Sequence, residues 1–283
     1  MPLLHELLTE QLSDTLCDID ALPVSFGEGL ACIYSRPGRA LRSWLRWVRA
    51  DFLQAAIVNM IREGLIGFDH DDEGVAVGYA TMANRLRKLP IGFGRTRYEV
   101  ILDDACQSAA QLVAAHSEDE DSKEGKTHSA SYDFGLAAFE KLKNRLAELI
   151  QNSPSEETPA TTLLDMATFF LNRLARTVNK FDRYAKAKLL DDIATMKAAI
   201  EEVDEVHFGL WEWLESLPVE SRILASGPRP GCVHVDHLAK GGHSGRANTF
   251  IIGLDDSRFP TRGGQDPLSV SYTHLTLPTK RIV

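Results

Sequence analysis

The 283-residue chain is 44% hydrophobic, 25% charged and 8% aromatic, which is the composition of a soluble globular protein of one large or two modest domains. No apolar run approaches the ~20 residues that span a bilayer, and the N-terminus lacks the pattern of a secretory signal, so we expect a cytoplasmic protein that makes no membrane contact. The net charge of −9 argues against a general nucleic-acid binder, and the four cysteines form neither a CxxC pair nor a disulfide ladder.

Hydrophobic periodicity predicts a mostly helical chain with α/β ends. We expect a helix at 2–20, a short strand within 21–29, helices at 38–64, 73–88, 97–115, 133–151, 160–178, 181–205 and 207–216, a glycine loop at 89–98, and a polar loop or disordered insertion at 116–131. After Pro218 we expect a strand at 232–238, a glycine-rich loop at 239–247 and a buried parallel strand at 248–254. An all-helical block at 35–217 therefore separates two α/β ends.

The first helix of this block contains an unusual excess of arginine, in the stretch RPGRALRSWLRWVRADF at 36–52. On a helical wheel its arginines share an arc of about 140°. They are Arg36, Arg39, Arg42, Arg46 and Arg49. The opposite side is apolar and holds Leu41, Leu45, Val48 and Phe52. Trp44 lies at the seam, and Trp47 lies among the arginines, where its ring is able to stack on a base. Paired arginine donors suit phosphate, and the presence of only one acid in the stretch favours that reading. The alternative is a solvated helix whose arginines pair with the surplus acids of the chain.

A basic and aromatic stretch, NRLRKLPIGFGRTRY, follows at 84–98. Its five cations are Arg85, Arg87, Lys88, Arg95 and Arg97. They flank a glycine loop that holds Phe93, and Tyr98 follows directly. Cations for the backbone and rings for the bases are what a channel for single-stranded DNA needs. The alternative is a helix–helix corner with Phe93 in the core, and these residues alone favour that alternative.

The segment 231–267 combines a strand, a glycine-rich loop with Lys240 and Arg246, and a second strand, a geometry that presents backbone N–H groups to phosphate. The Walker A pattern GxxxxGK[ST] occurs nowhere in the chain. Another hypothesis for this segment is a zinc site built from His234, Asp236, His237 and His243, although no HExxH or paired-ligand spacing supports it. Neither a GxSxG elbow nor a marked carboxylate pair is present, so we predict no catalytic centre and no bound metal.

This segment, VHVDHLAKGGHSGRANTFIIGLDDSRFP, resembles motif V and its flank in UvrD-like superfamily I helicases. More closely, HSGR, NTFIIGLDDSRFP and QDP resemble the variant in AddB-like proteins, which join a PD-(D/E)XK nuclease to a helicase-like body. Two further stretches are similar to segments of that family and occur in the same order. They are LPVSFGEG with RPGRALRSWLRWVRADF, and LPIGFGRTRY. The chain thus resembles an internal part of an AddB-like helicase–nuclease.

The resemblance implies a partial RecA-like parallel-sheet domain, of the P-loop NTPase type, that carries a large all-helical insertion. Residues 1–34 and 218–268 would be parts of the RecA-like domain. Residues 35–217 would be the insertion, comparable to subdomain 2B, with a flexible acidic loop at 116–131. Residues 269–283 resemble a translated sequencing-adapter tail, so we expect the native protein to be cut off in this chain near Leu268.

The implied parent function is ATP-linked processing of DNA double-strand breaks. Walker A would lie before Met1 and the nuclease carboxylates after Leu268, so ATP and Mg²⁺ belong to the parent protein and this part needs no cofactor. His237, Lys240, Gly241 and Gly242 match the motif V-like loop. The acid that the family has after its A-K-G is missing here, which puts nucleotide sensing in doubt and favours DNA binding or scanning.

Taken together, the partners that we expect are DNA, as a single strand or a duplex end, and a helicase partner subunit. The predicted DNA contacts are Arg39, Arg42, Arg46, Arg49, Trp47, Arg95, Arg97, Lys240 and Arg246. The competing hypothesis is a structural scaffold that docks a partner protein without binding DNA, which the net charge of −9 favours.

Overall fold

The computed structural model describes residues 24–68, 78–116, 123–155, 157–202, 209–230, 232–237 and 248–252, with residues 116 and 123–134 described for the backbone only. The chain divides into two compact units, Met1–Val235 and Asp236–Val283. The predicted helix at 2–20, the glycine-rich loop at 239–247 and the adapter-like residues 269–283 lie outside the described residues.

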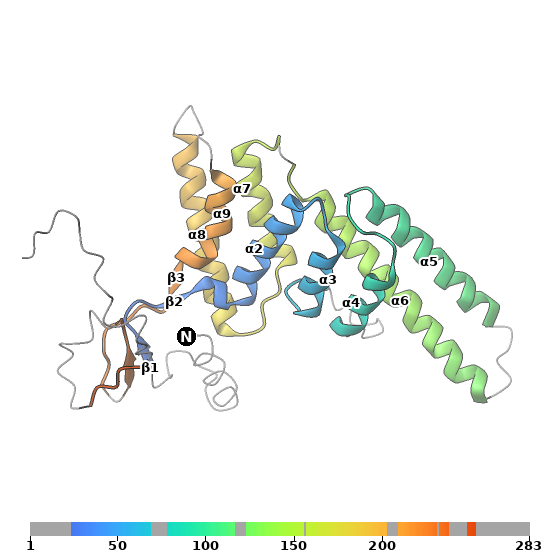
Figure 1. The fold of residues 1–283 in the computed structure, drawn as a ribbon, viewed down its shortest axis with the longest axis horizontal. Coiled ribbons are helices and arrows are strands. Elements are labelled where there is room, and N and C mark those ends of the chain that lie inside the picture. The colour runs from blue at the N-terminus through green and yellow to red at the C-terminus, as the bar shows by residue number, and fades with distance from the viewer. Residues whose placement is uncertain are drawn as a thin grey trace, which may run out of the picture. The chain divides into compact units, whose positions relative to one another are not determined.

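Two small sheets join segments that lie far apart in the sequence. β1 (Val24–Phe26) pairs in parallel with β4 (Val233–Val235), with Ser25 opposite His234. β2 (Leu30–Ala31) pairs antiparallel with β3 (Arg222–Ile223). A parallel pair requires a crossover connection, and here the helical block supplies it (Figure 1). The predicted strands within 21–29 and 232–238 are therefore both present, and they are partners of each other.

Helices make up most of the other described residues of the first unit, as the periodicity predicted. In chain order they are the short η2 (Cys32–Tyr34), α2 (Arg36–Arg49), α3 (Gln54–Arg62), α4 (Tyr79–Lys88), α5 (Arg97–His116), α6 (Lys123–Gln151), α7 (Ala160–Phe169), the π-helical turn η4 (Phe170–Leu174), α8 (Lys180–Glu201) and α9 (Leu210–Glu220). The mostly helical fold class is confirmed.

The single helix predicted at 38–64 is wrong, because the chain breaks into α2 and α3. Asp51 and Phe52 adopt left-handed backbone angles, with φ of 49° and 58°. The Phe52 N–H donates to the Trp47 carbonyl at 2.9 Å, and the Gly94 N–H donates to the Asp51 carbonyl at 2.8 Å. Contacts with a loop some forty residues away thus stabilise a turn that neither glycine nor proline marks in the sequence.

The polar segment at 116–131 was predicted to be a loop, yet α6 already begins at Lys123. Extending an existing helix adds one hydrogen bond for each residue fixed, so a polar stretch continues a helix that packing has nucleated elsewhere. Here α5 packs along α6, and the two run side by side as an antiparallel pair (Figure 1). Only residues 117–122 of the predicted loop lie outside the described residues.

The buried strand predicted at 248–254 is not present in its described part. Residues 248–252 have no strand assignment, and Phe250, Ile251 and Ile252 are 86%, 54% and 76% exposed. An apolar run becomes a strand only when another strand satisfies its backbone groups. No described segment pairs with this run.

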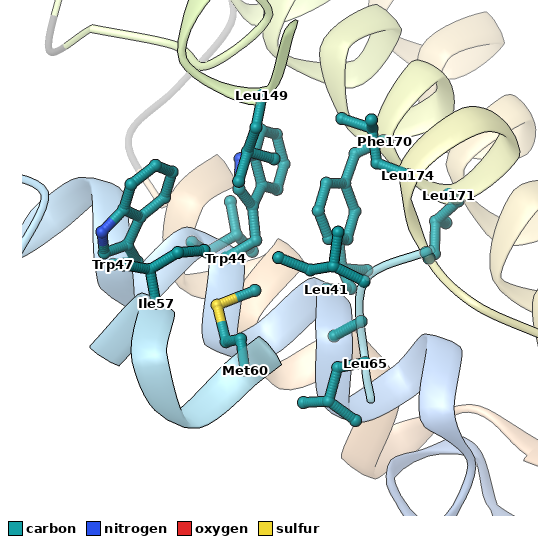
Figure 2. Packing of buried hydrophobic residues seen from close by; sticks show 14 of the residues in the cluster. Leu41, Trp44, Trp47, Ile57, Met60, Leu65, Leu149, Phe170, Leu171 and Leu174 are labelled. Atoms are coloured by element: carbon teal, nitrogen blue, oxygen red, sulfur yellow. The ribbon is translucent and has the colours of Figure 1, made fainter. Parts of the chain in front are cut away.

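The core of the first unit surrounds α2, which contacts α3, α8, α9 and η4. Trp44, predicted at the seam of the helix, is fully buried and stacks on Phe170 with ring centroids 4.6 Å apart (Figure 2). Its indole N–H donates to the Ser153 hydroxyl at 2.9 Å. Leu41, Leu149 and their neighbours fill the space around this pair (Figure 2). Among the helices that the structure describes, none is long and apolar enough to cross a membrane.

Candidate nucleic-acid interface

The arginine face of α2 is largely neutralised by acidic side chains of other helices. The ion pairs are Arg39–Glu63 at 3.4 Å, Arg49–Glu212 at 3.0 Å, Arg49–Glu215 at 3.5 Å, and Arg46–Glu215. The acids come from the end of α3 and from α9. This arrangement agrees with the alternative prediction for residues 36–52, in which the arginines pair with surplus acids of the chain. Exposed pairs of this kind exchange readily with solvent, so they compensate charge more than they add stability.

The two remaining arginines of the α2 face differ from the exposed pairs. Arg36 donates to the Asp182 carboxylate at 3.1 Å from its side chain and at 2.9 Å from its backbone, and Asp182 is only 2% exposed. Arg36 therefore ties α2 to the start of α8. Arg42 is half-buried, has no ion pair within the described part of the chain, and its Nε is buried without a hydrogen-bond partner.

The expectation that Trp47 lies among the arginines, open to a base, is wrong. The side chain is fully buried and meets Phe52 and Tyr98 edge-on, with ring centroids 4.8 and 5.9 Å away. The turn at Asp51 and Phe52 places one of these rings over it, and α5 supplies the other. Trp47 is therefore a core residue, and no base reaches it without opening the fold.

The loop between α4 and α5, at 89–96, is held in place by one side chain of α3. The Gln54 amide donates to the carbonyls of Leu86 and Leu89 at 2.6 and 2.8 Å, and its oxygen accepts from the Gly92 N–H at 2.9 Å. The Gln54 N–H in turn donates to the Gly92 carbonyl at 2.8 Å. Gly92 and Gly94 have φ of 72° and 93°, a conformation that other residues rarely adopt. The loop is thus fixed on both sides of Phe93.

Phe93 points outward from this loop. It is 58% exposed, so the helix–helix corner expected from the sequence is present but Phe93 does not fill its core. Arg87, Lys88 and Arg97 are exposed nearby in the sequence, and none of the three forms an ion pair with another described residue. The Arg97 guanidinium lies against the loop itself, because it donates to the Pro90 carbonyl at 2.8 Å. An exposed ring whose sequence neighbours include three cations without described ion pairs is a stronger candidate for DNA contact than the paired arginines of α2, although its residues alone favoured a structural role.

Arg49 and Arg95, from the two predicted basic stretches, are brought together. Both line an open cleft of about 940 Å³, with Trp211 on another side. Asp51 and Glu212 also line this cleft, so its charge is mixed. Arg95 is engaged within the protein, since it donates to the Ile150 carbonyl and lies 5.7 Å from the centre of the Phe52 ring.

At the parallel pair, the imidazole Nδ1 of His234 lies 2.8 Å from the hydroxyl of Ser25, which is 2% exposed. This contact fixes the register of β1 and β4. In the second unit, the His237 N–H donates to its neighbour Asp236 at 2.8 Å. The other predicted residues of this segment, Lys240, Gly241, Gly242 and Arg246, lie outside the described residues, and so does His243. Within the described ranges, no three His, Cys, Asp or Glu side chains gather as metal ligands.

Burial raises the pKa values of two side chains in the first unit, Cys32 and Tyr98. Loss of solvent raises the pKa of the Cys32 thiol to about 12, and Asp192 raises it further than Lys188 lowers it. Burial likewise raises the pKa of Tyr98 to about 12, and its hydroxyl donates to the Phe52 carbonyl at 2.7 Å. At neutral pH both groups remain protonated, so Cys32 is a structural thiol and not a nucleophile.

Comparisons of the chain with protein-family models, with curated proteins and with solved structures found no match.

Proposed function

We propose that this chain is an internal part of an AddB-like subunit of a bacterial DNA double-strand-break repair helicase–nuclease, and that its own task is to hold DNA. The observation that carries the proposal is the parallel pairing of Val24–Phe26 with Val233–Val235. The family resemblance assigns these two strands to one RecA-like domain that a helical insertion interrupts. Helices from Arg36 to Glu220 do lie between them in the sequence.

Support for DNA contact comes from the loop at 89–96 and the cations around it. Residues 84–98 contain five cations and no acid, in a chain whose net charge is −9. Phosphate groups attract such a locally basic surface even when the whole protein is acidic. Arg39, Arg46 and Arg49 become secondary contacts, because DNA would first have to displace Glu63, Glu212 and Glu215.

The sequence motifs and the described side chains offer no site that fits ATP or Mg²⁺ on its own. The sequence contains no Walker A loop to cradle phosphates, and the described side chains offer no cluster of three or more candidate metal ligands. We therefore propose neither ATP hydrolysis nor DNA cleavage by this chain.

Fluorescence anisotropy with a labelled single-stranded oligonucleotide tests the proposal. We expect binding that weakens steeply as salt rises, because each neutralised phosphate releases counterions. The variant with Arg87→Ala and Lys88→Ala should bind more weakly and show a salt slope smaller by about 2. The matched variant with Arg39→Ala and Arg46→Ala removes two paired arginines and should weaken binding clearly less than the Arg87→Ala, Lys88→Ala variant does. Absence of binding at low salt would refute the proposal.

A second candidate function, a scaffold that docks a partner protein, is favoured by the α2 ion pairs. The acids of these pairs leave little positive potential on that face. A surface that docks a protein needs less positive potential than one that binds DNA. In that case purified chain should bind no oligonucleotide at low salt and should bind a purified helicase partner subunit. DNA binding that the Arg87→Ala, Lys88→Ala variant weakens would count against the scaffold.

A further inference from the structure

We infer that Phe93 is a stacking platform for one unpaired base, so that the loop at 89–96 selects single-stranded over duplex DNA. This inference rests on the proposed function, and adds to it the residue and the form of DNA. Three observations carry it: the exposure of the ring, the hydrogen bonds that hold the loop, and the exposed cations that flank the ring in the sequence.

The exposure of Phe93 is not a consequence of loose structure. The loop on either side is held by the Gln54 amide, which contacts Leu86, Leu89 and Gly92, and by the bond from the Gly94 N–H to Asp51. Its neighbour Ile91 is fully buried, whereas Phe93 is 58% exposed. A large apolar side chain held in water is costly, and a pre-positioned ring gains binding free energy because little ordering remains to be done.

The cations that flank Phe93 in the sequence favour a nucleic acid over a protein partner. Arg87, Lys88 and Arg97 are exposed and form no ion pair among the described residues. The Arg97 side chain lies against this loop, since its atoms are 3.7–3.9 Å from where a Cβ on Gly92 or Gly94 would lie, and it donates to the Pro90 carbonyl. A ring to stack on a base, with cations to meet the adjoining phosphates, is the combination by which proteins bind single strands.

The same geometry discriminates between forms of DNA. In a duplex both faces of each base are covered by its neighbours, so a protruding ring gains a stacking partner only where a base is unpaired. Cations contact the phosphates of either form. We therefore expect the cations to set general affinity and Phe93 to set the preference for single strands.

The experiment compares the full chain with Phe93→Ala and Phe93→Trp, by anisotropy at low salt. The probes are an oligothymidine, an abasic oligonucleotide of the same length and charge, and a duplex. Phe93→Ala should weaken oligothymidine binding roughly 5- to 150-fold, the range of ~1–3 kcal/mol per stacked base. Binding of the abasic strand and the duplex should stay within about twofold, and Phe93→Trp should retain or exceed wild-type affinity for oligothymidine. The unfolding midpoint should not change, because the ring is not part of the core.

The outcomes separate the two proposals. If wild type binds oligothymidine in a salt-dependent way and Phe93→Ala binds it equally well, the stacking inference is overturned and DNA binding stands. Equal weakening on oligothymidine and on the abasic strand would also overturn it, since the loss would not involve a base. If wild type binds no probe at low salt, both proposals fail, and the exposed ring is better explained as a contact for a partner protein.

Discussion

Replacing Gln54 with alanine tests whether the loop that carries Phe93 is as firmly held as its contacts indicate. The Gln54 side chain makes three hydrogen bonds to backbone groups of this loop and its approach, with distances of 2.6, 2.8 and 2.9 Å. At about 1 kcal/mol net for each bond, their sum is about 3 kcal/mol. The Gly92 N–H is exposed and regains a water partner, so we expect a loss of about 2 kcal/mol in the free energy of unfolding.

The loop of the Gln54→Ala variant should also lose its fixed position. Ordering one side chain costs about 1 kcal/mol, so the affinity for oligothymidine should fall about fivefold although Gln54 itself touches no DNA. Urea denaturation gives the first quantity and anisotropy the second. Gln151→Ala serves as the control, because Gln151 is exposed and has no side-chain hydrogen bond to another described residue. Wild-type stability and affinity in Gln54→Ala would show that the contacts of Gln54 do not hold the loop.

Three further outcomes follow from the core and from the ion pairs. Trp44→Ala should lower the free energy of unfolding by ~3–5 kcal/mol, as a deleted buried aromatic does, and a loss below about 1 kcal/mol in urea denaturation would contradict the packing of Figure 2. Arg46→Ala should cost less than about 1 kcal/mol, since its pair with Glu215 is exposed, and a larger cost would show a role beyond charge compensation. Because burial raises the pKa of the Cys32 thiol from 9.0 to about 12, its contribution to stability is complete below pH 9.0 and is lost as the pH rises toward 12. The difference in the free energy of unfolding between wild type and Cys32→Ala should therefore shrink from pH 8 to pH 11. A constant difference would contradict burial of the thiol.

Local patterns predicted the mostly helical class and the approximate positions of most described helices. The helix starts at Ser35 and Asn179 follow from side chains that cap them, by accepting from the Gly38 and Asp182 N–H groups. The turn between α2 and α3 was missed because its stability comes from Trp47 and from the loop around Gly94, which no local signal in the sequence connects. The exposed run at 248–252 was read as a strand for the same reason, since composition does not reveal whether a pairing partner exists.

The candidate site was predictable in composition but not in arrangement. The basic stretches were evident, yet their ranking reversed, because the acids of α9 that neutralise Arg46 and Arg49 lie more than 160 positions away in the sequence. Spacing on a helical wheel placed Trp47 near the arginines, and only the tertiary contact with Tyr98 shows that it is buried. Gln54, which fixes the loop, carries no sequence signal of that role.

Photo-crosslinking to an oligonucleotide that contains a halogenated pyrimidine, followed by trypsin digestion and mass spectrometry, examines the DNA-binding surface most directly. Cleavage after Lys88 and Arg95 releases residues 89–95, LPIGFGR, in which Phe93 is the only aromatic side chain. We expect the attached nucleotide on this peptide. A crosslink confined to the α2 peptides at 43–46 and 47–49, or no crosslink at a concentration that saturates binding, would contradict our assignment of the DNA contact to this loop.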